Sequence, residues 1–136
     1  MFYVKNEKKI FFIKKNSKGI NYPISLKIEI INNKKDIIFQ KGNCFANLDF
    51  EKLKFPLILR NWKNGDYFYP FGMYGKKKLS DFFTDKKFSI FEKEKIMLLI
   101  SDEKIVWIIG QRIDRRFKID KKTKKIFRIE KLKNKF

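Results

Sequence analysis

The pattern of hydrophobic and polar residues divides the first third of the chain into short strands separated by polar turns. Apolar runs at residues 10–13 and 37–39 predict two strands, and the segment 24–30 between them alternates with period two. Its isoleucine and leucine side chains would share one face and its polar side chains the other. Polar segments at 16–19 and 32–36 predict turns. We therefore expect a sheet with one face in water.

The rest of the chain combines apolar strands with a long loop that is rich in glycine and proline. Residues 56–59 predict a short buried strand, and the loop follows at 61–75. The fully apolar run 105–109 predicts another strand, and segments 112–119 and 126–130 predict two more.

Two short helices are predicted between these strands. Three apolar residues with i, i+3, i+4 spacing predict a helical segment over residues 78–83. Ser89 and Glu92 have the spacing of a capping box, so a second helix is predicted from residue 90 to about residue 97. The predicted fold class is α+β, with mostly antiparallel, sandwich-like strands and two short helices.

Composition and charge narrow the classes of function. Lysine and arginine number 34 against 15 acidic residues, which gives a net charge of +19. A hydrophobic share of 43% with 16 phenylalanines excludes a disordered polycation. This charge favours nucleic acid as the partner; an anionic membrane surface and a lysine bias without function are the alternatives. No apolar run approaches the ~18 residues of a transmembrane helix, and no membrane partner is predicted.

The missing residue types exclude several kinds of site. The chain has no histidine, which excludes Ser-His-Asp and Cys-His catalysis and every metal site that needs imidazole, and no metal site is predicted. Cys44 is the single cysteine and cannot form an internal disulfide. The N-terminus also lacks an apolar signal segment, so a cytoplasmic location is predicted.

A lysine cluster is the first candidate binding site. Lys76, Lys77 and Lys78 follow the Gly-x-x-Gly segment of Gly72 and Gly75, at the start of the first predicted helix. Free helix N–H groups, a close backbone approach at glycine and clustered ammonium groups together describe an anion site, and nucleic-acid phosphate is the natural occupant. The alternative is a solvated lysine run, since cations at a helix start oppose the helix dipole.

An arginine cluster is the second candidate. Three of the five arginines, Arg112, Arg115 and Arg116, lie within five residues. Arginine makes bidentate contacts to phosphate or base edges that lysine cannot copy, so we predict that all three bind RNA. The alternative is an internal network in which Arg112 and Arg116 pair with Asp114 or with Asp66 on the loop. Aromatic residues around the loop could stack on bases or pack internally.

One long, ordered motif runs through residues 55–129. It reads Arg, then Gly-Asp, then Pro-x-Gly-Met-x-Gly-x-x-Lys-Leu, then Trp-x-x-Gly-x-Arg-x-Asp-x-Arg. Besides the lysines and arginines above, its positions are Arg60, Gly65, Asp66, Pro70, Gly72, Gly75, Trp107, Gly110 and Asp114. The motif resembles the C-terminal domain of bacterial tRNA(Ile)-lysidine synthetase; Ser89 departs from it, where the family commonly has proline. Residues 48–136 are assigned to that tRNA-binding domain, and residues 1–47, by position alone, to a strand-rich linking region before it.

The resemblance implies a role in tRNA modification. The family uses ATP to join lysine to the wobble cytidine of an isoleucine tRNA with a CAU anticodon. Its catalytic half is an N-terminal ATP-pyrophosphatase domain with a Ser-Gly-Gly-x-Asp-Ser loop, and this chain has no Gly-Gly pair. We therefore expect a tRNA-recognition portion that is inactive alone and binds no cofactor, with ATP and Mg²⁺ serving the whole enzyme. The catalytic domain would lie in cis or on a separate chain.

Two other classes of function stay open. A stand-alone basic RNA-binding protein would use the same surface without any ligase activity. The resemblance also extends to an editing-type domain of phenylalanyl-tRNA synthetase, but a hydrolase would need a poised nucleophile or carboxylate in a pocket.

Overall fold

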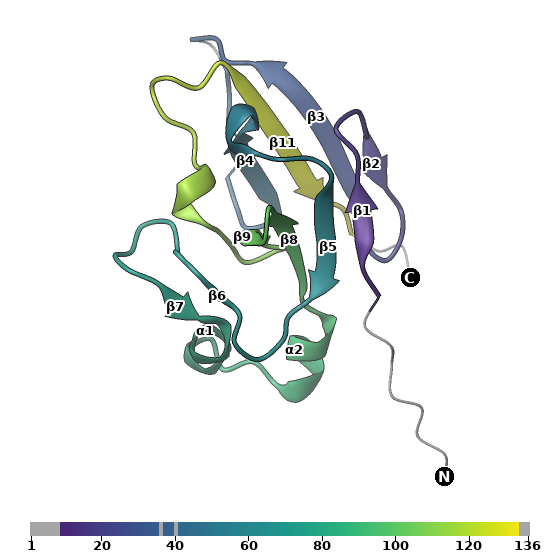
Figure 1. Cartoon of the computed structure of the whole chain (residues 1–136), viewed down its shortest axis with the longest axis vertical. Coiled ribbons are helices and arrows are strands. Elements are labelled where there is room, and N and C mark those ends of the chain that lie inside the picture. The colour runs from purple at the N-terminus through teal and green to yellow at the C-terminus, as the bar shows by residue number, and fades with distance from the viewer. Residues whose placement is uncertain (1–8, 36, 40, 134–136) are drawn as a thin grey trace.

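Two large antiparallel sheets form most of the structure, a computed structural model that describes residues 9–35, 37–39 and 41–133 (Figure 1). The first sheet has the order β1-β5-β8-β9-β10. Its strands are β1 Phe11–Ile13, β5 Leu57–Asn61, β8 Met97–Ser101, β9 Lys104–Ile108 and β10 Arg112–Ile113. The second sheet has the order β2-β3-β11-β4. Its strands are β2 Gly19–Ile20, β3 Leu26–Asn32, β11 Lys125–Lys131 and β4 Phe45–Asp49.

Shorter elements complete the fold, and the α-helices lie together at one end of the molecule (Figure 1). They are the two-stranded ribbon of β6 Tyr67–Phe68 and β7 Lys77–Lys78, the helices α1 Leu79–Asp85 and α2 Ile90–Lys95, and the 3₁₀ turns η1 Phe50–Lys52 and η2 Arg115–Phe117. The predicted α+β class with antiparallel sheets and two short helices is confirmed. None of the described helices is long and apolar enough to cross a membrane.

Strands from both sides of residue 47 pair with one another. In the first sheet β1 pairs with β5, and in the second sheet β3 and β4 both pair with β11. The described part of residues 1–47 therefore contributes strands to both sheets, and the division at residue 47 stays a prediction from sequence.

The core has two parts, and β8 and β9 contribute to both. Leu99 and Trp107 face the space between the two sheets. Leu98 and Ile108 face the opposite way, into a smaller cluster against α1. Because both faces of these strands are buried, their sequences do not alternate and are apolar except for Ser101 and Lys104, at the ends next to the β8–β9 turn.

Both helices form where the sequence predicts them. The three spaced apolar residues of α1 are buried in the smaller cluster. The capping box of α2 is complete: Ser89 Oγ accepts from the Glu92 N–H, and Glu92 Oε1 accepts from the Ser89 N–H, both at 3.1 Å.

Three sequence-based predictions are wrong. Residues 37–39 form no strand, and their apolar side chains are not buried. Segment 112–119 is not one strand: β10 ends at Ile113, and the Asp114 side chain caps the 3₁₀ turn η2. The chain from Met97 to Ser101 is the buried strand β8, where the sequence predicted only a helix end at about residue 97. Asp36, the last residue of a predicted turn, and the first eight residues lie outside the described residues.

Candidate nucleic-acid interface

A buried ion pair fixes the start of the glycine loop. Arg60, on β5, donates to both carboxylate oxygens of Asp66, with Nη1–Oδ2 at 2.9 Å and Nη2–Oδ1 at 3.0 Å. The Lys63 N–H adds a third hydrogen bond to this carboxylate at 2.8 Å, and Asp66 is only 9% exposed. The Asp66 carbonyl also accepts from the first N–H of α1, that of Leu79, at 3.0 Å. This clamp joins β5, the loop and α1.

A second buried carboxylate fixes the middle of the loop. Asp114 is fully buried and accepts four hydrogen bonds. One comes from the Tyr69 N–H at 2.9 Å, and three come from Arg116: its N–H at 2.8 Å, Nε at 3.0 Å and Nη2 at 2.9 Å. Backbone bonds from the Phe71 N–H to the Ile113 carbonyl and from the Arg115 N–H to the Tyr69 carbonyl continue the contact. The loop is thereby pinned to the edge of the first sheet.

The three clustered arginines have different partners. Arg116 pairs with Asp114, as the internal-network alternative predicts. Arg112 does not pair with it; Arg112 Nη1 contacts the Met73 sulfur at 3.5 Å. Arg115 donates from Nη1 to the Met73 carbonyl at 2.8 Å. Asp66 pairs with none of the three, because Arg60 occupies it.

Cations and tyrosines form a row next to these clamps, which we call the cation–aromatic row: Lys76, Tyr67, Tyr69, Arg115 and Arg116. Lys76 Nζ lies 4.7 Å from the centre of the Tyr67 ring, and the Tyr67 and Tyr69 rings meet edge to face at 6.1 Å. The guanidinium carbons of Arg116 and Arg115 lie 4.3 and 5.2 Å from the centre of the Tyr69 ring. The fold thus brings one residue of the lysine cluster and two of the arginine cluster onto one surface. Charges that flank aromatic rings suit a nucleic-acid backbone and its bases.

The other two lysines directly precede α1, as predicted, and Lys78 is its N-cap residue. Lys77 and Lys78 form β7 and precede α1 in an extended conformation. Lys77 Nζ forms an ion pair with Asp85. The hollow that the three lysines line also contains the carboxylates of Asp81 and Asp85. The first N–H of α1, that of Leu79, is bound by the Asp66 carbonyl and is not available to an anion.

The remaining motif residues have structural positions. Trp107 is buried between the sheets, and Pro70 forms an isolated bridge with Asp114. The four motif glycines all have positive φ, a conformation that residues with a Cβ rarely adopt: Gly65, Gly72, Gly75 and Gly110. This explains why glycine persists there in so lysine-rich a chain.

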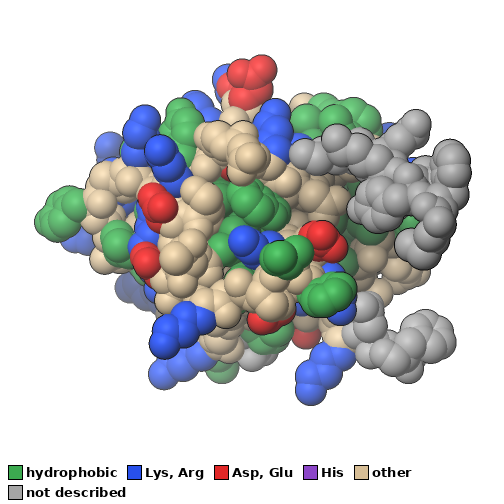
Figure 2. Space-filling model, turned by 90° about the horizontal axis from the view of Figure 1, so that it is seen from below, with side chains coloured by type: hydrophobic (Ala, Val, Ile, Leu, Met, Phe, Trp, Pro, Cys, Tyr) green, Lys and Arg blue, Asp and Glu red, His purple; other side chains and the backbone are tan. Residues whose placement is uncertain are grey.

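The surface around the loop and helices is basic and partly apolar. Figure 2 views the end of the molecule that carries the helices, with Lys and Arg side chains spread around the face and exposed hydrophobic side chains among them. The loop itself exposes Phe71, Met73 and Tyr74. Their exposure was not predicted, because a sequence pattern cannot show which aromatic residues of a loop find a place in the core.

Comparison with known proteins identifies the family. The family described as "TilS substrate C-terminal domain" matches residues 57–130, more than half of the chain. The chain belongs to this family. The matched range contains both clamps and the whole cation–aromatic row.

The TilS C-terminal relatives support this assignment over a wider range. The tRNA(Ile)-lysidine synthase of Parabacteroides distasonis is 50% identical over 123 residues, 90% of this chain and 28% of the relative. That of Bacteroides thetaiotaomicron is 51% identical over 83 residues, 61% of this chain and 19% of the relative. A crystal structure of a TilS C-terminal domain has the same fold, with a TM-score of 0.76 and 18% identity, and covers 93% of this chain and 99% of that one. The chain spans about a quarter of the curated relatives' length.

Proposed function

We propose that this chain is the tRNA-recognition portion of a tRNA(Ile)-lysidine synthase. The observation that carries the proposal is the cation–aromatic row, in which two loop tyrosines meet Lys76 and the arginines of η2, beside two buried carboxylates inside the matched range. The net charge of +19 adds a long-range attraction for RNA.

The substrate in this proposal is an isoleucine tRNA with a CAU anticodon, in the cytoplasm. An N-terminal ATP-pyrophosphatase domain, in cis or on a separate chain, uses ATP and Mg²⁺ to convert the wobble cytidine to lysidine. This chain contributes affinity and orientation for the tRNA and no catalytic residue. The supporting observations are the names of the relatives and the family match.

A binding titration tests the proposal. The isoleucine tRNA with a CAU anticodon and the methionine tRNA that shares this anticodon are titrated at several salt concentrations. We expect the affinity to fall steeply with salt, by about 0.7 to 0.9 in log K per log unit of salt for each phosphate contact. An affinity that does not change with salt concentration would contradict RNA binding by this chain. Equal binding of both tRNAs would leave a general RNA-binding function in place of the specific one.

A matched pair of lysine variants shows whether the cation–aromatic row is the contact. Lys76→Ala removes a cation from the row, whereas Lys14→Ala removes an exposed lysine beside β1, at the opposite edge of the first sheet. We expect Lys76→Ala to reduce the salt slope by about 0.7 to 0.9 and Lys14→Ala to leave it unchanged. Equal effects would mean that net charge alone attracts the RNA.

The 136-residue chain alone is expected to transfer no lysine to tRNA. The reason is the missing Gly-Gly pair of the ATP-binding loop. Incubation with ATP, Mg²⁺, labelled lysine and the isoleucine tRNA measures this directly, and incorporation of label would contradict the assignment of catalysis to another domain.

A further inference from the structure

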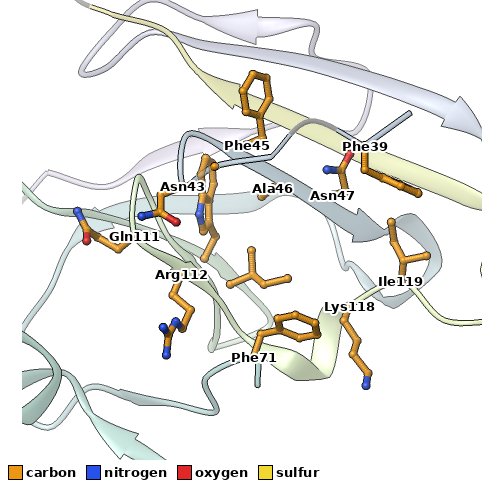
Figure 3. A pocket seen from close by; sticks show the side chains of 13 residues that line it. Phe39, Asn43, Phe45, Ala46, Asn47, Phe71, Gln111, Arg112, Lys118 and Ile119 are labelled. Carbon is orange, nitrogen blue, oxygen red and sulfur yellow. The ribbon is translucent and has the colours of Figure 1, made fainter. Parts of the chain in front are cut away.

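A cleft of about 580 Å³ opens beside the loop, between the segment that leads into β4 and the edge formed by β10 and the residues after η2 (Figure 3). Its volume lies within the range of about 300–1,000 Å³ that is typical of ligand pockets. None of the five residues of the cation–aromatic row lines it. The cleft is therefore a separate feature of the same region.

The lining combines aromatic rings, amides and cations. Phe39 and Phe71 supply exposed ring surface, Asn43 and Gln111 supply side-chain amides, and Arg112 and Lys118 supply positive charge. No carboxylate is present among the described lining residues. In Figure 3, Asn43, Gln111 and Arg112 lie on one side of the cleft, and Phe71 and Lys118 lie on another.

The polar groups of the cleft are free to bind a ligand. Within the described part of the chain, the side chains of Asn43 and Gln111 make no hydrogen bond. Every buried side-chain polar atom in this part has a partner, so these two unpartnered amides must be open to solvent. Among the described residues, the Arg112 guanidinium makes one polar side-chain contact, to the Met73 sulfur at 3.5 Å. Lys118 Nζ lies 5.9 Å from the centre of the Phe71 ring.

We propose that this cleft binds one unpaired nucleotide of an RNA. The base packs against Phe71, which is 49% exposed. The amides of Asn43 and Gln111 hydrogen-bond to the edge of the base, which an unpaired base leaves free. Arg112 and Lys118, on different sides of the cleft, bind the two phosphates that flank the nucleotide. The proposal rests on the proposed RNA-binding function and adds a site to it.

The chemistry of the lining selects this occupant over others. Two cations with no opposing carboxylate favour an anionic ligand, and an apolar peptide segment or a second basic copy of this chain would leave both cations unpaired. A base pair inside a duplex cannot enter, because its edges are occupied and its faces are stacked. The cleft therefore selects for unpaired nucleotides, whereas the cation–aromatic row contacts backbone in either form.

The experiment compares two labelled RNAs by fluorescence anisotropy: a short single-stranded oligoribonucleotide and a blunt-ended hairpin. The variants are Phe71→Ala and Arg112→Ala in the cleft, with Phe91→Ala as the control. Phe91 is an aromatic residue on α2, outside the cleft and 76% exposed. We expect both cleft variants to weaken binding of the single strand by about tenfold and to change hairpin binding less than about twofold. Phe91→Ala should change neither.

The outcomes separate this inference from the proposed function. Equal loss for both RNAs, or no loss for the single strand, would overturn the nucleotide site while RNA binding itself stands. If the parent binds neither RNA, both proposals fail. A parent that dimerises, and that Phe71→Ala converts to a monomer, would make the cleft an interface between copies. NMR resonances of the Asn43 and Gln111 side-chain amides that do not shift when nucleoside monophosphates are added would also contradict the proposal. If Phe71→Ala folds poorly, Arg112→Ala provides the same test.

Discussion

Arg112 and Arg116 lie four positions apart in the sequence and should respond differently to substitution by alanine. Arg116 forms two side-chain hydrogen bonds to the fully buried Asp114 carboxylate, whereas Arg112 contacts only the Met73 sulfur within the described residues. Arg116→Ala should destabilise the fold, and Arg112→Ala should leave it intact while weakening binding of single-stranded RNA.

The loss of stability expected for Arg116→Ala depends on the Asp114 carboxylate, which stays buried without its arginine partner. Breaking a buried ion pair by removing one partner costs ~3–5 kcal/mol, because a buried charge stays uncompensated. Two features lower this value here: the Arg116 side chain is 31% exposed, and the backbone N–H groups of Tyr69 and residue 116 still bond to Asp114. We expect a loss of about 2–4 kcal/mol in the free energy of unfolding. At about 3–5 °C per kcal/mol for a domain of this size, the melting temperature falls by roughly 6–20 °C.

Urea and thermal unfolding, followed by the fluorescence of Trp62 and Trp107, measure both variants. Arg112→Ala should stay within about 0.5 kcal/mol of the parent, as surface substitutions usually do. Adding Asp114→Asn to Arg116→Ala should recover part of the loss, because a neutral amide removes the buried charge. The reasoning is refuted if the two arginine variants unfold alike, or if Asp114→Asn deepens the loss in the Arg116→Ala background.

Three further predictions concern charge, pH and capping. Changing the three lysines of residues 76–78 to alanine should weaken every tRNA similarly and lower the salt slope, and a variant that binds as tightly as the parent would contradict the phosphate contact. The hydrogen bond from Lys52, with that from the Lys122 N–H, lowers the pKa of Asp120. Its stabilisation is thus complete above the ordinary value of about 3.9 and lost as pH falls through the lowered pKa, and Lys52→Met should move the NMR titration of Asp120 upward. Ser89→Ala should cost ~1 kcal/mol of stability by removing the α2 cap, measured by urea unfolding.

The sequence predicts those elements that depend mainly on residues close together in the chain. Most of the alternating segment 24–30 lies in β3, where Leu26 and Ile28 are buried but Ile30 is exposed. The Ser89–Glu92 pair forms a complete capping box, because a capping box depends on neighbours along the chain. The strand β8 was missed because burial on both faces removes the alternation that marks a strand, and its apolar run directly follows a helix. The apolar run at 37–39 was misleading, since a strand needs a partner and the structure supplies none to these residues.

The sequence indicated which residues belong to the candidate site but not how they are arranged in space. Arginine is rare in this chain, so the cluster of Arg112, Arg115 and Arg116 stood out. Their separate partners depend on contacts between distant segments, such as the bond from the Tyr69 N–H to Asp114 across 45 residues. On the predicted strand 112–119, Arg112, Asp114 and Arg116 would share one face, but the Asp114 side chain caps a 3₁₀ turn that ends the strand pattern. The cleft was not predicted, because its walls come from three separate parts of the chain.

The two buried carboxylates explain how so basic a surface keeps a defined shape. Cations crowded on one loop repel each other, and this repulsion favours open conformations of the loop. Asp66 and Asp114 oppose it from beneath, and each uses one arginine, Arg60 or Arg116, as an internal partner. Because these carboxylates also bind backbone N–H groups of the loop, they fix where the remaining cations point. The net charge therefore overstates the number of cations that are available to bind RNA. Substitutions of the paired residues should destabilise the loop, whereas substitutions of the other cations should only weaken RNA binding.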